Sequence, residues 1–153
     1  MGVMIQRRFP VAGGAAVPMG VDKSGSQQMT SSFSQVTGWA IRSGYPNTVI
    51  TNNAIVMSSN IINAVIAYQG TFVGVGLTSN VKAIRLLRNG VVVDTQSATG
   101  GANNGSFVTR SGVFNLSLVA GDVLTMEAMH GSATASNRTI QAGAVYTFIT
   151  IDS

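Results

Sequence analysis

The side chain with the greatest catalytic potential is His130, the single histidine of the chain, which follows the single glutamate, Glu127, by three positions. A histidine held beside a carboxylate can act as a general acid or base. On a β-strand, however, side chains three positions apart project from opposite faces. The spacing therefore predicts that His130 is a residue at a strand end, and that the two side chains do not form a catalytic pair.

The other carboxylates are four aspartates that lie far apart in the sequence: Asp22, Asp94, Asp122 and Asp152. Hydrolysis by paired carboxylates requires two acids within about 5–10 Å of each other, and nothing in the sequence demands that pairing. Asp122 follows Ala120 and Gly121 and is predicted to be a turn residue bonding its own backbone. We therefore expect no catalytic residue. The alternative is that the protein is an enzyme, and an activity that is lost in His130→Ala would support that alternative.

Metal and cofactor sites are also not predicted. The chain has no cysteine, and its acidic residues lack the spacing of zinc or calcium ligands. No glycine-rich loop follows a strand and opens a helix, as a phosphate-binding loop would. We therefore expect no cofactor and no metal.

The composition of the chain predicts a surface that is covered by something. Only 9% of the 153 residues are charged, against roughly 25% in ordinary soluble domains. A partner, or other copies of the chain, would cover the exposed apolar surface. The nine basic residues form no dense stripe, so no nucleic-acid partner is expected. No apolar run approaches the roughly 18 residues of a membrane span, and no secretory signal is indicated.

The first thirty residues differ from the rest. They hold two of the three prolines and a Gly13-Gly14 pair, and neither helical nor strand periodicity persists in them. We predict an extended N-terminal arm over residues 1–30, with a disordered leader as the alternative, and one domain over 31–153. The arm residues expected to dock on a partner are Met4, Arg7, Arg8, Phe9, Val11 and Met19.

From residue 33 onward, short runs rich in β-branched and aromatic residues alternate with Gly, Asn and Ser clusters. This pattern predicts an all-β sandwich or barrel. Asn89-Gly90 between two apolar runs predicts a hairpin, because both positions favour a positive φ. The predicted strands span residues 33–41, 48–51, 54–57, 61–75, 81–88, 91–97, 106–109, 112–118, 123–130 and 138–151.

Two of the predicted strands have apolar residues on both faces. In 61–75 one face carries Ile62, Ala64, Ile66 and Tyr68, and the other carries Val65 and Ala67. In 138–151 one face carries Val145, Thr147, Ile149 and Ile151, and the other carries Tyr146 and Phe148. Such strands are covered on both sides, either by another subunit or by a long loop of the same chain.

Three segments, in this order, carry a resemblance to a known family: VKAIRLLRNGVVVDTQSA, GVFNLSLVAGDVLTMEAMHG and AGAVYTFITI. Together with FSQVTGWAIRSGYPNTVITNNAIVM upstream, they resemble the tumour-necrosis-factor-like jelly roll, whose members include the globular heads of the complement first component. The resemblance implies a ten-strand antiparallel jelly-roll sandwich, no catalytic residues, and a homotrimer with the last strand along its axis. The interface residues assigned on this basis are Ile66, Tyr68, Tyr146 and Phe148.

A short, cysteine-free version with only an arm before it resembles proteins in the virions of tailed phages. The first hypothesis is therefore a trimeric capsid decoration or cement protein, made in the host cytoplasm and placed on the virion surface. Its arms would dock on other virion proteins such as the major capsid protein. The second is a tail-associated receptor-binding module that offers loops 100–105 and 131–137 to a cell-surface glycan. Trp39 and Tyr45 would then be candidate stacking residues, with a core position for Trp39 as the competing interpretation.

Overall fold

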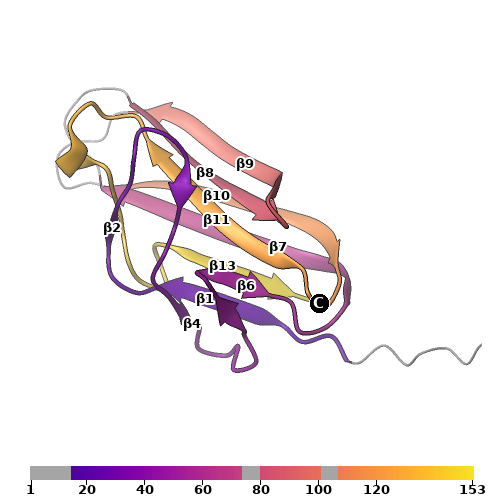
Figure 1. Ribbon diagram of the computed structural model, residues 1–153. Helices are drawn as coiled ribbons and strands as arrows, with labels where there is room; N and C mark the ends of the chain where they lie inside the picture. The colour runs from indigo at the N-terminus through magenta and orange to yellow at the C-terminus, as the bar shows by residue number, and fades with distance from the viewer. Residues whose placement is uncertain (1–14, 74–79, 101–106) are drawn as a thin grey trace, which may run out of the picture.

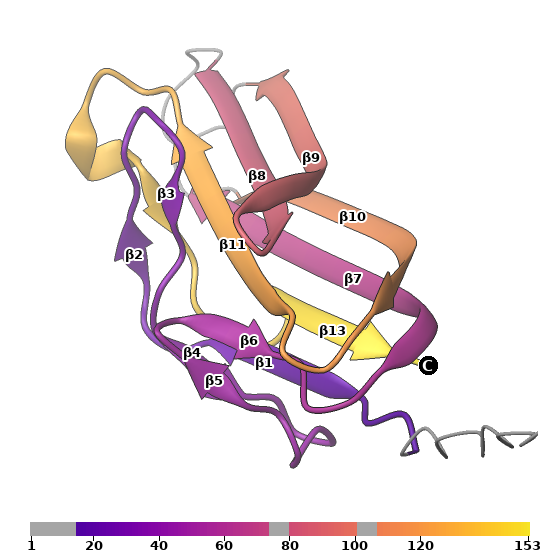
Figure 2. The same ribbon diagram turned by 45° about the vertical axis from the view of Figure 1, so that its right-hand side comes forward.

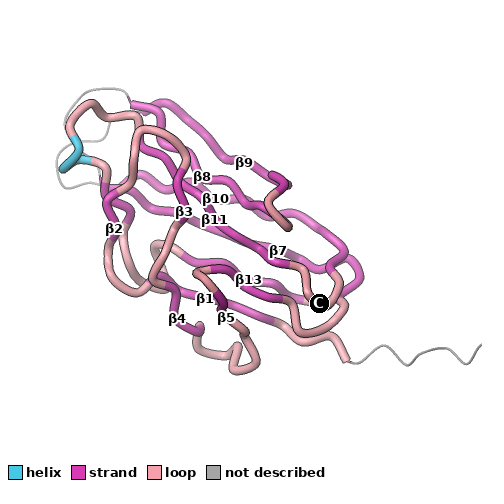
Figure 3. The backbone as a smooth tube through the Cα atoms, viewed as in Figure 1, coloured by secondary structure: helices cyan, strands magenta, loops and turns pink. Residues whose placement is uncertain are grey.

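The strands of this protein follow the alternation of its apolar residues. The computed structural model describes residues 15–73, 80–100 and 107–153. Its strands are β1 (Met19–Lys23), β2 (Gln27–Gln28), β3 (Ser34–Gln35), β4 (Trp39–Ile41), β5 (Ile50–Thr51), β6 (Ala54–Val56), β7 (Ile61–Val73), β8 (Asn80–Arg88), β9 (Val91–Gly100), β10 (Phe107–Leu118), β11 (Val123–His130), β12 (Thr139–Ile140) and β13 (Phe148–Asp152). In this part of the chain the helical element is one short 3-10 turn, η1 (Ala135–Asn137), as Figure 3 shows. The prediction of an all-β protein is confirmed.

Two antiparallel sheets form the sandwich (Figure 1). The seven-stranded sheet has the order β2-β12-β7-β13-β1-β4, with β10 paired to β7 as well. The six-stranded sheet has the order β5-β6-β11-β8-β9, with β3 paired to β11. The turned view in Figure 2 shows β11, β8 and β9 in front of β7 and β10. This is the jelly-roll arrangement that was expected, although the described residues hold thirteen strand segments, four of them of two residues, in place of ten.

Apolar side chains from both sheets fill the space between them. β11 buries every second residue, Leu124, Met126, Ala128 and His130. From the seven-stranded sheet, Ile66, Tyr68 and Phe72 of β7 and Ile149 and Ile151 of β13 are buried against them. The predicted hairpin is confirmed, because Asn89 and Gly90 have φ of 51° and 80° and join β8 to β9.

The N-terminal boundary predicted at residue 30 is wrong. Residues Met19–Lys23 form β1, which pairs with both β13 and β4 in the seven-stranded sheet. Gln27 and Gln28 pair with β12. The polar composition of this segment hid the strand, because β1 is short and only Met19, Val21 and Lys23 project inward. The sandwich therefore begins at Met19.

The last predicted strand is interrupted. Residues 138–151 form β12, then a turn over 141–147, then β13. The turn depends on Gly143, whose φ is 113° and whose carbonyl accepts hydrogen bonds from the N–H groups of Tyr146 and Thr147. Val145 and Tyr146 thus belong to a turn, whereas Thr147, Ile149 and Ile151 share the buried face as predicted. Segments 106–109 and 112–118, predicted as two strands, fall within the single strand β10 over its described length.

Near the start of β7, the side chains lie on other faces than the predicted alternation gives. Asn63 has a φ of 57°, and the register with β10 shifts at this point, where Ile61 pairs with Leu118 and Ala64 with Leu116. An irregularity of this kind moves the side chains before it to the other face. Ile61 is therefore buried and Ile62 is 87% exposed, the reverse of the alternation predicted for these two residues.

Candidate functional site

The outward face of the seven-stranded sheet carries apolar side chains that the chain itself leaves uncovered. Val65 and Ala67 of β7 face outward beside Asn115 and Val113 of β10. Val113 is 70% exposed, and Val65 is 39% exposed. Outward positions of a solvated antiparallel sheet are ordinarily polar. This part of the sheet therefore has the character of a surface that another molecule covers.

A loop closes one side of this face. The guanidinium of Arg42 pairs with Asp22 of β1 and lies over the Phe148 ring, 4.7 Å from its centroid. The Tyr45 ring packs on Gly20, where an added Cβ would approach the ring to 2.9 Å. The Tyr45 hydroxyl donates to Asp152 at 3.0 Å, and burial together with Asp152 raises the pKa of Tyr45. Residues 41–48 thus cover β1 and leave β7 and β10 open.

A turn borders the open region on its other side. Gln69, on the outward face of β7, donates from Nε2 to the carbonyls of Val145 (2.8 Å) and Tyr146 (3.1 Å). This fixes the turn over 141–147 against the sheet and presents Val145, which is 73% exposed. The Tyr146 ring stacks at a tilt on Phe107, with 5.0 Å between centroids.

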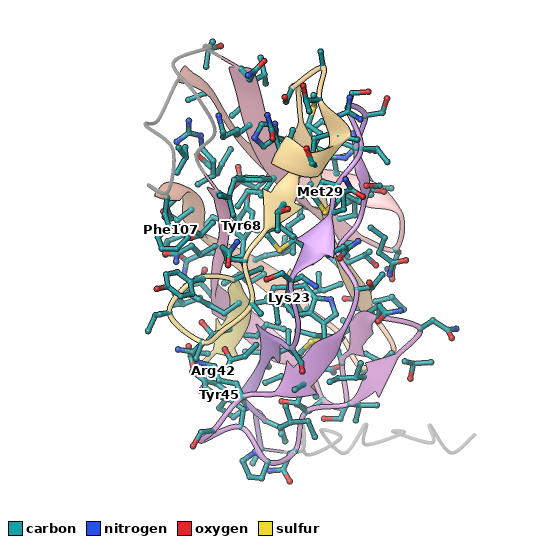
Figure 4. All side chains as sticks on the ribbon, turned by 90° about the vertical axis from the view of Figure 1, so that its left-hand side faces the viewer. Lys23, Met29, Arg42, Tyr45, Tyr68 and Phe107 are labelled. Atoms are coloured by element: carbon teal, nitrogen blue, oxygen red, sulfur yellow. The ribbon has the colours of Figure 1, made fainter. Side chains whose placement is uncertain are left out.

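We call the resulting surface the apolar strip and define it as Val65, Phe107, Val113, Val145, Tyr146 and Phe148. Figure 4 shows Phe107, Arg42 and Tyr45 along the same side of the molecule. Between the apolar members, the outward positions hold small polar residues such as Thr109, whose hydroxyl lies 2.9 Å from that of Thr71. None of the six side chains of the strip is charged. Charged groups border it, because Asp152 lies opposite Val65, Asp22 lies opposite Phe148, and the Arg42 guanidinium lies over the Phe148 ring.

The structure separates the four residues predicted for a subunit interface. Tyr146 and Phe148 are half-buried members of the apolar strip. Ile66 and Tyr68 are 0% and 1% exposed because they face the core of the sandwich. They have no surface to offer another subunit, and their assignment to an interface is wrong. The cause is parity: Ile66 and Tyr68 alternate with the outward residues Val65, Ala67 and Gln69.

Sequence reasoning missed Val65, Phe107, Val113 and Val145 as members of this surface. For Val113 a signal was present. Phe114, Leu116 and Leu118 alternate with Asn115 and Ser117, so Val113 continues the outward series as an apolar residue in a polar row. The position of Phe107 depends on where β10 begins, and that of Val145 on how the 141–147 turn folds back. The position of Val65 depends on which face of β7 packs against the other sheet.

The residues predicted to dock on a partner fall into two groups. Met4, Arg7, Arg8, Phe9 and Val11 lie outside the described residues. Met19 is described, and its prediction as a docking residue is wrong. It pairs with Ile151 in β1 and is 0% exposed in the core, so its side chain cannot reach a partner.

The groups considered for catalysis have structural partners. Glu127 accepts from Arg85 Nε at 2.6 Å, on the opposite side of β11 from the buried His130, as predicted. Asp122 accepts from the Val119 backbone N–H at 2.8 Å and from Arg88 at 2.7 Å, which confirms its predicted role in the turn. Burial raises the pKa of Asp122, but these bonds and that from Asn89 outweigh it and lower the pKa below its usual value.

Other kinds of site were searched for over the described ranges. Residues 15–73, 80–100 and 107–153 contain neither a pocket nor a group of three or more side chains placed to hold a metal ion. In the same ranges no helix has the length and apolar character to cross a membrane. Trp39 is half-buried and packs against the core, and Tyr45 is held on Gly20, so neither is a freely exposed stacking platform.

Comparison with known proteins places the fold. No family model and no curated protein matches the sequence. Among solved structures, the chain is similar to Eiger TNF from S. frugiperda, with a TM-score of 0.64, 9% identity and coverage of 90% of this chain and 91% of that one. Murine APRIL gives a TM-score of 0.63, 11% identity and coverage of 89% and 98%. The globular domain of zebrafish complement 1qA protein gives 0.58, 14% identity and coverage of 88% and 94%.

These likenesses, all below 15% identity, establish the architecture. The described chain has the jelly-roll fold of tumour-necrosis-factor and complement globular domains over nearly its whole length. The fold predicted from the resemblance is confirmed.

Proposed function

We propose that this chain is a non-enzymatic assembly protein that forms a homotrimer through the apolar strip. The observation that carries the proposal is that the members of the strip lie together on the outward face of β7, β10 and β13 and on the turn before β13. Val113 at 70% exposure and Phe107 at 50% are side chains that a second copy would remove from water, and each fully buried residue of this size contributes about 1.5–3 kcal/mol.

Closed cyclic symmetry suits such a surface. If the strip of one copy contacts a different face of the next copy, the copies form a ring when the rotation that relates them closes. The loop over residues 41–48, held by Arg42 and Tyr45, lies beside the strip. Ile41 at its start, 52% exposed, and Val49 directly after it, 42% exposed, are the apolar groups that the strip of the next copy would contact. Sedimentation velocity of the full chain tests the proposal, since a trimer has three times the 15.8 kDa mass of the chain.

The finer role we propose is that of a tailed-phage capsid decoration or cement protein on the virion surface, docking through its N-terminal segment on the major capsid protein. The segment enters the sandwich at one end. The Val17 N–H donates to Ser59 Oγ at 3.0 Å, and Ala15, Ala16 and Pro18 are exposed. In a trimer three such segments would bind together and gain affinity by multivalency.

A tail-associated receptor-binding module is the second candidate. It is favoured by the exposed loop over residues 131–137, which lies with η1 at the end of the sandwich away from the C-terminus (Figure 1). Quantitative mass spectrometry of purified particles separates the two roles. A decoration protein would approach the copy number of the major capsid protein, and a tail protein would reach a small fraction of it. Absence from particles would contradict both.

A further inference from the structure

The turn that joins β8 to β9 contains one of the two Asn-Gly pairs of the sequence, Asn89-Gly90. Both residues are exposed, and a Cβ on Gly90 would meet no atom of the described structure within 4 Å. An asparagine side chain is most open to attack by the next backbone nitrogen when glycine follows, because glycine has no side chain to hinder the approach. The sequence of this turn is therefore that of a chemically labile site.

The reaction open to this pair is deamidation, and water is its only co-reactant. The Gly90 backbone nitrogen gives up its proton and bonds to Cγ of Asn89, the bond from Cγ to Nδ2 breaks, and ammonia leaves with that proton. Water then opens the cyclic imide. Opening at Cγ leaves an aspartate side chain at position 89, and opening at the main-chain carbonyl leaves an isoaspartate. Either product carries a carboxylate where the amide was.

The folded turn holds the Asn89 amide by both of its polar atoms. Nδ2 donates to Asp122 Oδ1 at 2.7 Å, and Oδ1 accepts the Val123 backbone N–H at 2.9 Å. The Asn89 N–H in turn donates to the Val123 carbonyl at 2.8 Å. Attack at Cγ requires the amide plane to turn toward the Gly90 nitrogen, and this turning breaks both side-chain hydrogen bonds. The fold therefore opposes the reaction at a pair whose sequence favours it.

The same contact makes the product unfavourable in this turn. Replacing Nδ2 by an oxygen puts two carboxylates at hydrogen-bond distance, where like charges repel each other. Asp122 is 4% exposed, so salt and water screen this repulsion little. The Arg88 guanidinium, 2.7 Å from Asp122 Oδ2, carries a single positive charge and can neutralise only one of the two carboxylates.

We infer that Asn89 is a deamidation site that the folded turn protects, and that its modification weakens the turn irreversibly. The reaction requires a local opening of the turn, of the kind that folded proteins undergo without unfolding as a whole. The carboxylate that remains cannot donate to Asp122, so the original hydrogen bond does not re-form. The inference does not depend on the proposed trimer, because all of these contacts lie within one copy.

The natural chain tests the protection without any substitution. The full chain is incubated at mildly alkaline pH, once folded and once in guanidinium chloride, and peptide mapping by mass spectrometry follows the conversion of Asn89. We expect conversion at least about tenfold slower in the folded chain, because the attack first requires loss of a hydrogen bond to a charged acceptor. In guanidinium chloride the rate should match that of Asn104-Gly105, the other Asn-Gly pair. Equal rates for Asn89 in the folded and the unfolded chain would overturn the proposal.

Asn89→Asp tests the consequence of the modification. This variant keeps an acceptor for the Val123 N–H and replaces only the donor to Asp122. At pH 7 its urea midpoint of unfolding should lie below that of the natural chain. The difference should shrink at pH 4, where a protonated carboxyl group at position 89 can donate to Asp122.

Asn53→Asp is the matched control for this variant. Asn53 also has a positive φ, 58°, and its Oδ1 accepts the Gly38 backbone N–H at 2.9 Å. A carboxylate retains that acceptor, so the midpoint should change little at either pH. An Asn89→Asp variant that is as stable as the natural chain at pH 7, or that loses no more than Asn53→Asp, would contradict the inference.

Discussion

The hydroxyl of Tyr68 donates to Asp94 Oδ2 at 2.8 Å and thereby ties the centre of one sheet to the edge of the other. Tyr68 lies on β7 and Asp94 on β9, and the bond passes Gly112 of β10. A Cβ on Gly112 would lie 2.5 Å from Tyr68 Cε1 and 2.6 Å from Asp94 Oδ2. Burial and the neighbouring Asp94 raise the pKa of Tyr68, so the hydroxyl stays protonated as a donor.

This relationship predicts that Gly112→Ala destabilises the fold by about 1–3 kcal/mol, the usual cost of overpacking. Tyr68→Phe should cost about 1.5–3 kcal/mol, since the lost bond has a charged acceptor. Urea unfolding followed by fluorescence measures both. Ser111→Ala, at the exposed neighbouring position, is the control and should change the free energy of unfolding little. Equal stability of Gly112→Ala and the natural chain would contradict the close packing described.

A second prediction concerns the turn between β10 and β11. Asp122 is 4% exposed and binds Arg88, Asn89 Nδ2 and the Val119 N–H. Asp122→Ala leaves all three donors without their acceptor, and we expect a loss of about 2–4 kcal/mol in thermal or urea unfolding. Asn60→Ala removes one exposed bond to the same turn, at Ala120 N, and should cost less. A smaller effect of Asp122→Ala than of Asn60→Ala would show that this network does not hold the turn.

A third prediction follows from His130. Burial, together with the positive charges of Lys82 and Arg138, lowers the pKa of His130 from 6.5 to about 4. Between these two values the unfolded chain binds a proton that the folded chain does not, so stability falls as the pH falls from about 6.5 to about 4. This difference in pKa corresponds to a total loss of about 3 kcal/mol in the free energy of unfolding, at roughly 1.4 kcal/mol per pKa unit. Below pH 4 this contribution is constant.

Urea unfolding at several pH values in chloride buffers measures that loss. His130→Phe, which keeps a ring against Phe72, should lack the slope between pH 6.5 and 4. Asp122, whose pKa is lowered, should add a separate loss only as the pH falls below the usual aspartate range near 3.8. A slope that persists unchanged in His130→Phe would contradict the assignment.

Much of the fold was predictable because apolar and polar residues alternate clearly in a strand that has only one face in the core. The strand over 123–130 was predicted with its observed bounds, and the Asn89-Gly90 hairpin followed from turn chemistry alone. The failures occur where one residue changes the geometry. Asn63 reverses the faces at the start of β7, and Gly143 ends the run that would have placed Val145 and Tyr146 in a strand.

The candidate surface was predicted only in part for a related reason. Tyr146 and Phe148 were identified from their aromatic character, but Ile66 and Tyr68 were placed on the wrong side of their strand. Because both faces of β7 carry apolar residues, its sequence does not show which face packs against the other sheet. That choice depends on long-range pairing, such as Ile149 opposite Tyr68, which periodicity does not contain. The contact between Arg110 and the Lys82 carbonyl was equally hidden, since these residues approach each other only through the packing of the two sheets.

The central claim is that the apolar strip closes a homotrimer, and sedimentation velocity on the full chain and two single variants tests it most directly. Val113→Glu places a charge in the middle of the strip, where burying an unpaired carboxylate is costly. Val91→Glu, at a 68% exposed position on β9 away from the strip, is the matched control. The account predicts a trimer for the natural chain and for Val91→Glu, and a monomer that keeps its circular dichroism spectrum for Val113→Glu. A natural chain that sediments as a monomer at all concentrations, or a Val113→Glu variant that stays trimeric, would contradict it.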